Sequence, residues 1–166
     1  MATLSIDHQE LYKEIRLFLL GLFPDAAMQI IQSTQNNQPL PENAIVMQFL
    51  FDSNMDEAVT TYDPPEYAIV QNSVQARMQL SFYGVHAESR SRIVANLWKN
   101  YYGADNMEIC KPLYVQSRHR LPYINDSNNY EDRFILDLAL QYNPYVTHAQ
   151  DFTQEARVTI KPIPEH

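Results

Sequence analysis

The chain has 166 residues, of which 45% are hydrophobic and 19% charged, so it can bury one core and is too poor in charge to be disordered. Its net charge of -8 comes entirely from residues 1–76, which hold ten acids against two bases, whereas residues 77–166 hold ten of each. Because residues 17–76 contain no lysine or arginine, they cannot supply a continuous phosphate-binding surface, which argues against a sequence-specific nucleic-acid-binding protein.

The first predicted element is a helix over residues 7–20. Asp7 and Glu10 have the spacing of a capping box, and apolar residues follow at intervals of three and four. Gly21 and Pro24 are expected to end the helix, because glycine accepts a left-handed turn and proline cannot continue the helical ladder. The apolar residues of this helix are Leu11, Ile15, Phe18, Leu19 and Leu22.

Two strands and an acidic flap are predicted next. Residues 28–32 form a short apolar run, and after a polar loop residues 44–51 form an almost continuously apolar strand. Such a strand is expected to be covered on both faces, with Phe49 and Phe51 on the same side of the pleat. Residues 52–66 are acidic and include two prolines, so we expect a projecting hairpin or flap there.

A further strand and a second helix follow the flap. Residues 77–82 alternate between polar and apolar side chains, which predicts a strand that Gly84 closes. A helix is predicted over residues 87–101, with Gly103 as its carboxy-terminal cap. Its apolar stripe is expected to pack on a sheet and consists of Ile93, Val94, Leu97, Trp98 and Tyr101.

The clearest strand covers residues 133–142, where apolar and polar side chains alternate throughout. The Asn-Pro pair at 143–144 should end it, and residues 156–161 are expected to add an edge strand before a flexible tail over 161–166. Together the elements predict a single α+β domain over residues 1–166, with a mainly antiparallel sheet packed with two principal helices.

No group of residues has the spacing of a catalytic or metal site. The five histidines are scattered, and the three glycines are too few for a phosphate loop or a dinucleotide fingerprint. Cys110 has no base near it in the sequence, and adjacent acids such as Asp56 and Glu57 would point to opposite faces of a strand. We therefore predict no catalytic residue, no cofactor site and no metal site.

The sequence also carries no sign of export or of a membrane span. The amino-terminal residues lack the basic start and apolar run of a secretory signal. The apolar stretch 17–23 is far shorter than the ~20 residues that a membrane-spanning helix needs. We expect a product that stays in the cytoplasm when it is made and does not enter a membrane.

Five short stretches between residues 81 and 144 have the order and spacing of a known family, and the resemblance covers most of residues 5–160. They are Ser81-Phe82-Tyr83-Gly84, Pro112-Leu113-Tyr114, Arg120-Leu121-Pro122-Tyr123-Ile124-Asn125, Tyr130-Glu131-Asp132-Arg133-Phe134-Ile135-Leu136-Asp137 and Leu140-Gln141-Tyr142-Asn143-Pro144. In this combination the chain resembles the phage neck or tail terminator proteins found in prophages of long-tailed phages. The combination carries the resemblance, because each stretch alone is modest.

The resemblance implies a virion structural protein rather than an enzyme. Such a protein would close into a ring, expected to be a hexamer, that caps the tail tube or links it to the connector below the portal. The implied partners are further copies of the chain, the tail tube protein and the head-completion or connector protein. DNA would pass through the channel without specific binding, and the protein would reside in the virion neck after assembly in the host cytoplasm.

The uneven distribution of charge indicates how a ring could be held. An acidic half and a neutral half can pack head to tail, and repeated heterologous contacts close a ring when the rotation permits. The acids of the flap are expected either to contact arginines of the next copy or to line the channel and repel DNA phosphates. The candidate interface or channel residues are Asp52, Asp56, Glu57, Asp63, Arg90, Arg92, Arg118 and Arg120.

Three other functions fit the sequence. The chain could be a stopper or connector subunit on the head side of the junction, a monomeric binding module whose acidic flap engages a basic host protein, or a small hydrolase without a familiar motif. A ring seen by native mass spectrometry would favour a virion subunit, and a strict monomer at high concentration would favour the last two.

Overall fold

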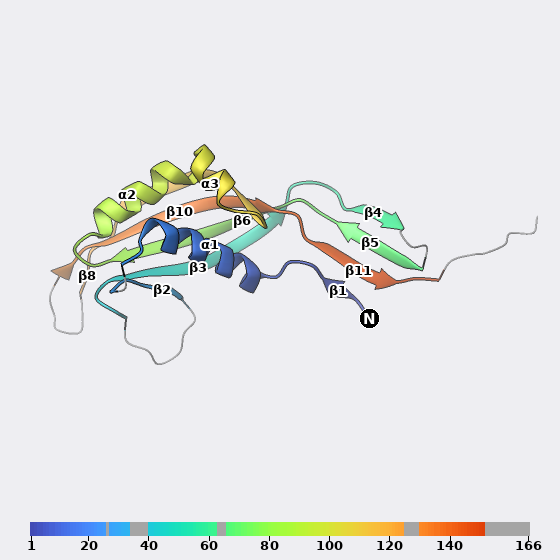
Figure 1. Cartoon of the computed structure of the whole chain (residues 1–166), viewed down its shortest axis with the longest axis horizontal. Helices are drawn as coiled ribbons and strands as arrows, with labels where there is room; N and C mark the ends of the chain where they lie inside the picture. Colours follow the sequence, from blue (N-terminus) through green and yellow to red (C-terminus); the bar gives the residue numbers. More distant parts are fainter. Residues whose placement is uncertain (26, 34–39, 63–65, 125–129, 152–166) are drawn as a thin grey trace, which may run out of the picture.

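Long strands and the helices that cover them form most of the described structure (Figure 1). The computed structural model describes residues 1–25, 27–33, 40–62, 66–124 and 130–151. The edge strand expected over 156–161 and the tail expected over 161–166 therefore lie outside the described residues. The described helices are α1 (His8–Leu22), α2 (Ala87–Trp98) and α3 (Tyr101–Asp105).

The main sheet has five strands with the helices on one of its faces. Their order across the sheet is β2 (Gln29–Gln32), β3 (Ala44–Asn54), β6 (Val74–Tyr83), β10 (Arg133–Tyr142) and β7 (Cys110–Arg120). All neighbours are antiparallel except β2 and β3. This arrangement confirms the predicted α+β fold with a mainly antiparallel sheet.

A second sheet continues the main sheet at one end. Its strands lie in the order β1 (Thr3–Leu4), β11 (Tyr145–Ala149), β5 (Tyr67–Gln71) and β4 (Val59–Tyr62), and all are antiparallel. β5 leads directly into β6, and β10 leads into β11, so two strands of the main sheet extend into the second one. The only other described strands, β8 (Tyr123–Ile124) and β9 (Tyr130–Glu131), pair with each other.

This second sheet projects beyond the helices (Figure 1). We call its strands and their connections, residues 1–5, 55–62, 66–73 and 143–151, the arm, and we call the rest of the described chain the body.

Helix α1 begins as the sequence predicts and ends two residues later. The Asp7 carboxylate accepts a hydrogen bond from the Glu10 N–H at 2.9 Å, and the Asp7 N–H donates to the Glu10 carboxylate at 3.1 Å, which completes the capping box. Gly21 lies inside the last turn, so its expected role as the stop is wrong. The Phe23 N–H still donates to the Leu19 carbonyl, and the helix ends there because Pro24 has no N–H to continue it.

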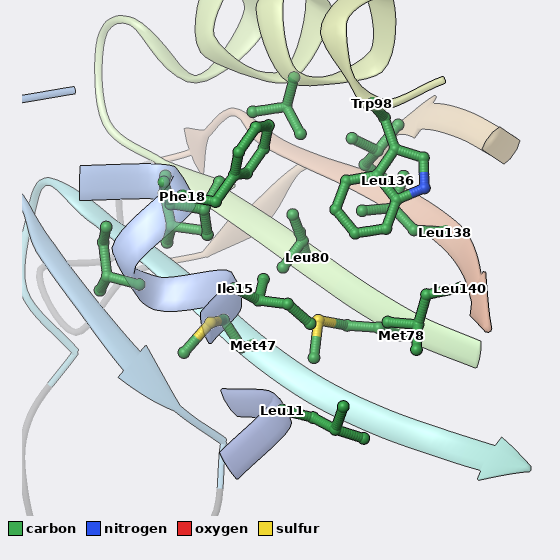
Figure 2. Close-up of a cluster of buried hydrophobic side chains, with 14 of the residues drawn as sticks. Leu11, Ile15, Phe18, Met47, Met78, Leu80, Trp98, Leu136, Leu138 and Leu140 are labelled. Carbon is green, nitrogen blue, oxygen red and sulfur yellow. The ribbon is translucent and has the colours of Figure 1, made fainter. Parts of the chain in front are cut away.

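The core lies between the helices and the main sheet (Figure 2). Leu80, Leu136 and Leu138 are fully buried on the face of the sheet that the helices cover. Trp98 of α2 is also fully buried, and its ring N–H donates to the Ala139 carbonyl at 3.0 Å. A buried indole therefore keeps its hydrogen bond while it contributes a large apolar surface. The α1 residues buried in the same core are Leu11, Ile15, Phe18 and Leu19.

The second predicted helix is divided into α2 and α3. Of its predicted apolar stripe, Val94 and Trp98 are buried, whereas Ile93 and Tyr101 are exposed. Gly103 is not a cap but lies within α3. A Cβ at this position would stand 2.4 Å from the Trp98 carbonyl oxygen, so glycine is what allows α3 to approach the end of α2 so closely.

β10 and β6 follow the predicted alternation, whereas β3 and β7 depart from the prediction. β10 has the predicted bounds of 133–142. In β3, a bulge between Phe49 and Phe51 turns these side chains to opposite faces, and Phe51 is exposed. The expectation that this strand is covered on both faces is therefore wrong for its second half. β7 was not predicted, because Pro112 and two register shifts interrupt its alternation.

Candidate interaction surfaces

The arm is a sheet without a helix over either face, as far as the described residues show (Figure 1). Of the residues in its four strands, only Ala68 is buried. Its apolar side chains are instead open to solvent: Leu4, Val59, Tyr62, Tyr67 and Tyr145 are each exposed, with Val59 and Tyr62 at 60%. A sheet normally buries one face against a second layer, so this arm has the composition of a surface that another protein covers.

The charged side chains among the described residues of the arm are acidic. Asp56, Glu57, Glu66 and Asp151 are exposed on it, and no lysine or arginine occurs anywhere in residues 1–5, 55–73 or 143–151. The chain has twelve lysines and arginines; two lie in residues 152–166, outside the described residues, and the other ten lie in the body. The described lysines and arginines are therefore confined to the body, but the two halves of the sequence do not correspond to arm and body, because six of the ten acids of residues 1–76 also lie in the body.

The four acids predicted as interface or channel residues occupy different settings. Asp52 is the last-but-two residue of β3 in the body, where its carboxylate lies 3.2 Å from His8 Nε2 and accepts a hydrogen bond from the Tyr142 hydroxyl at 3.1 Å. Burial raises the pKa of Tyr142 to about 12, and the hydrogen bond to Asp52 adds to this rise.

The other three predicted acids belong to the connection between β3 and β5. Asp56 is at the base of the arm, where its carboxylate accepts a hydrogen bond from the Ser73 N–H at 2.8 Å. Glu57 is exposed and has no ion pair with any described residue. Asp63 lies outside the described residues. Of the three predicted acids that the structure describes, Glu57 is the one whose side chain has no hydrogen bond or ion pair with a described residue.

Three of the four predicted arginines already have acidic partners within the chain. Arg118 forms an ion pair with Glu88 at 2.7 Å and lies over the Phe134 ring, with only 15% of its side chain exposed. Arg120 pairs with Asp132. The side chain of Arg90 is turned inwards and lies 3.9 Å from Asp25. The structure therefore does not join the predicted acids to these arginines within one copy, as far as the described residues go.

Arg92 differs from the other three arginines because it points away from the body. It is exposed on α2, and Lys99 is exposed two helical turns later, so both cations lie on the outward side of the helix. Neither has an ion pair with a described residue. Ile93 is 42% exposed beside them, and Tyr101 at the start of α3 is 78% exposed. We call Arg92, Ile93, Lys99 and Tyr101 the α2 face.

The main sheet has a second, polar face that is free of helices within the described part of the chain. Asp137 lies near its middle and accepts hydrogen bonds from Gln79 at 3.0 Å and from Ser117 at 2.6 Å. Arg77 donates to Gln116 at 2.8 Å and to the Tyr114 hydroxyl at 2.7 Å. These bonds run between side chains of neighbouring strands, so they hold the polar face as an ordered layer.

The groups that could support catalysis are placed unfavourably for it. Cys110 is buried, and burial raises the pKa of its thiol, with the Glu14 carboxylate reinforcing the rise, so a thiolate nucleophile is not available at neutral pH. That carboxylate instead accepts the N–H groups of Ile109 at 2.8 Å and Cys110 at 2.9 Å. No three His, Cys, Asp or Glu side chains among the described residues converge as metal ligands.

An open cleft of about 790 Å³ lies beside β8 and β9. Its charged lining residues are Glu42, Arg120, Glu131 and Asp132. Arg120 and Asp132 form an ion pair with each other there. The cleft therefore offers a mixed polar surface rather than a set of groups aimed at one reacting atom.

Comparison with known families identifies the family of the chain. A model of the family described as phage neck terminator protein matches residues 9–164 of the chain. The chain belongs to the phage neck terminator family. Membership confirms the resemblance seen in the sequence and implies a structural role at the neck or tail of the virion, in association with other phage proteins. No curated protein matches the chain. None of the helices in the described ranges is long and apolar enough to cross a membrane.

Sequence reasoning about this neck terminator protein missed the α2 face and the extent of the arm. The arm draws on four separate segments of sequence, of which only residues 55–62 and residue 66 lie in the predicted flap. The α2 face was hidden because Ile93 and Tyr101 were assigned to the core stripe by their helical spacing. An exposed pair of cations at 92 and 99 was the one signal that could have revealed it.

Proposed function

We propose that the protein is a structural subunit that forms a ring at the phage neck, where it terminates the tail tube and joins it to the head connector. Membership in the neck terminator family gives the location, and the arm carries the argument for the ring. An exposed, partly apolar sheet without lysine or arginine is poorly suited to remain uncovered, and the body, which holds all the described lysines and arginines, offers it cationic side chains as partners.

In this proposal the protein has a mechanical and not a catalytic role. Its partners are other copies of itself, expected to be six in one ring, together with the tail tube protein and a head-completion or connector protein. DNA passes through the channel without specific binding. The cation-free arm is consistent with this, because it offers no positive charge to phosphates. Assembly would take place in the host cytoplasm.

Reconstitution on tails tests this function directly. Tails are assembled without the protein, purified, and mixed with the purified chain and with heads, and the products are counted by electron microscopy. We expect a ring at the head-proximal end of the tail and joined particles only when the chain is present. Binding to heads but not to tails would identify a head-side stopper instead, and binding to neither would reject a neck function.

Native mass spectrometry of the free chain gives the stoichiometry of any ring formed in solution. A chain that stays monomeric in solution and also binds no tails would favour the binding-module hypothesis.

A further inference from the structure

We infer that the tip of the arm of one copy docks on the α2 face of the next copy in the ring. The inference rests on the proposed ring, and it names the two surfaces that hold it together. It follows from the composition of the arm tip, from the charges of the body and from the positions of the two surfaces in the molecule.

The arm tip brings two exposed tyrosines and two acids together. Tyr62 ends β4 and Tyr67 begins β5, and both are exposed. The Gln150 N–H donates to the Glu66 carbonyl at 2.9 Å, which places Asp151 beside Glu66 at the same end of the arm. Tyrosines with an apolar ring and a polar tip, accompanied by charges of one sign, are typical of a protein-binding surface.

Contact between two arms is disfavoured by this same composition. The arm has exposed acids and no lysine or arginine, so a symmetric contact between arm tips would bring acidic side chains together without a lysine or arginine to compensate them. Like charges across an interface suppress association. The partner surface for the arm is therefore expected to be basic, and in a ring of identical copies it must lie on the body.

The α2 face is a part of the body that meets this requirement. Arg92 and Lys99 are both exposed and are not ion-paired with any described residue, whereas Arg90, Arg118 and Arg120 already contact carboxylates. Ile93 and Tyr101 add exposed apolar surface beside the two cations. The α2 face thus matches the arm tip both in charge and in apolar character.

The contact has to be between copies. In Figure 1 the arm extends from one end of the molecule, and α2 covers the sheet towards the opposite end, so a copy cannot place its arm tip on its own α2 face. Arm and α2 face are also different surfaces, so their contact is heterologous, and contacts of this type propagate from copy to copy until the ring closes.

Charge reversal with rescue tests the pairing. One variant carries Arg92→Glu and Lys99→Glu, a second carries Glu66→Lys and Asp151→Lys, and a third carries all four changes. All four side chains are exposed and form no hydrogen bond or ion pair within the described part of the chain, so the folded subunit should tolerate each change. Circular dichroism melting checks this, and Lys13→Glu on the exposed side of α1 serves as a control for a charge reversal outside the two surfaces, with a change of -2 in net charge against -4 in the first variant.

Association is measured by sedimentation velocity in solution and by occupancy of terminator-free tails. We expect each double variant to associate about tenfold or more weakly than the wild type. The variant with all four changes should recover to within about threefold of the wild type, and Lys13→Glu should have little effect. If association is weakened in both double variants and does not recover in the variant with all four changes, the two surfaces do not contact each other and the inference is overturned.

Two further outcomes separate this inference from the proposed function. If the wild type forms a ring and the double variants do so equally well, the docking inference is wrong and the ring function stands. If the wild type neither self-associates nor occupies tails, the ring function itself is wrong, and the inference falls with it.

Discussion

Replacing Leu138 by aspartate tests whether the face of β10 that meets the helices is the core on which this fold depends. Leu138 is fully buried between β6 and β7, and its neighbours on the same face are Leu136 and Leu140. Loss of a buried leucine side chain alone costs about 3–5 kcal/mol. A buried carboxylate without a partner adds several kcal/mol, or is protonated at a similar cost. The sum is comparable with the ~5–15 kcal/mol by which a domain is stable, so we expect no folded, soluble Leu138→Asp protein.

Two companion variants make this measurement decisive. Leu138→Ala should remain soluble and lose about 3 kcal/mol of unfolding free energy in urea titrations followed by circular dichroism. Leu17→Asp places the same charge on the exposed side of α1, where Leu17 is 68% exposed, and should cost about 1 kcal/mol or less. A soluble Leu138→Asp protein that melts cooperatively near the wild-type temperature would refute the assignment of this face to the core.

Three further changes test the turn after β6, an alkaline titration and the acids of the arm. Gly84→Ala should destabilise the fold by about 2 kcal/mol or more in urea titrations, because Gly84 has a φ of +99° and a Cβ there would meet Asn43 Oδ1 at 2.3 Å. Since the pKa of Tyr142 is about 12 in the folded state and about 10 when unfolded, its contribution to stability is complete below pH 10 and is lost as the pH rises towards 12. Tyr142→Phe should therefore flatten the fall in stability over that range by on the order of 2 kcal/mol, and an unchanged fall would show that another group causes it. Asp56→Asn with Glu57→Gln should weaken the ring in a salt-dependent way if these acids bind the next copy. If the acids line the channel, the same double change should leave the ring intact and increase DNA retention. Sedimentation with and without DNA distinguishes the two outcomes, and no change in either measurement would reject both.

The sequence by itself determined those parts of the fold that depend on local chemistry and regular periodicity. The capping box of Asp7 and Glu10 sets the start of α1, because both partners lie within one turn of chain. The ten alternating residues of β10 define a strand with one fully apolar face, which needs no knowledge of its neighbours. Helices separated by such strands were enough to predict an α+β fold, and the combination of five short stretches was enough to predict the family.

Tertiary structure alone decided which surfaces remain available to a partner. The sequence around Arg90, Arg92 and Arg118 does not show which of them is accessible. Arg90 contacts Asp25, and Arg118 contacts Glu88, which lies 30 residues away in the chain. Arg92 has no such contact with a described residue and is exposed. The arm likewise combines segments from both ends and the middle of the chain, through pairs such as Thr3 with Thr147. Local periodicity cannot reveal either feature, because burial and ion pairing depend on which distant segments meet, and a lack of cover over a sheet becomes visible only once all the neighbouring elements have been placed.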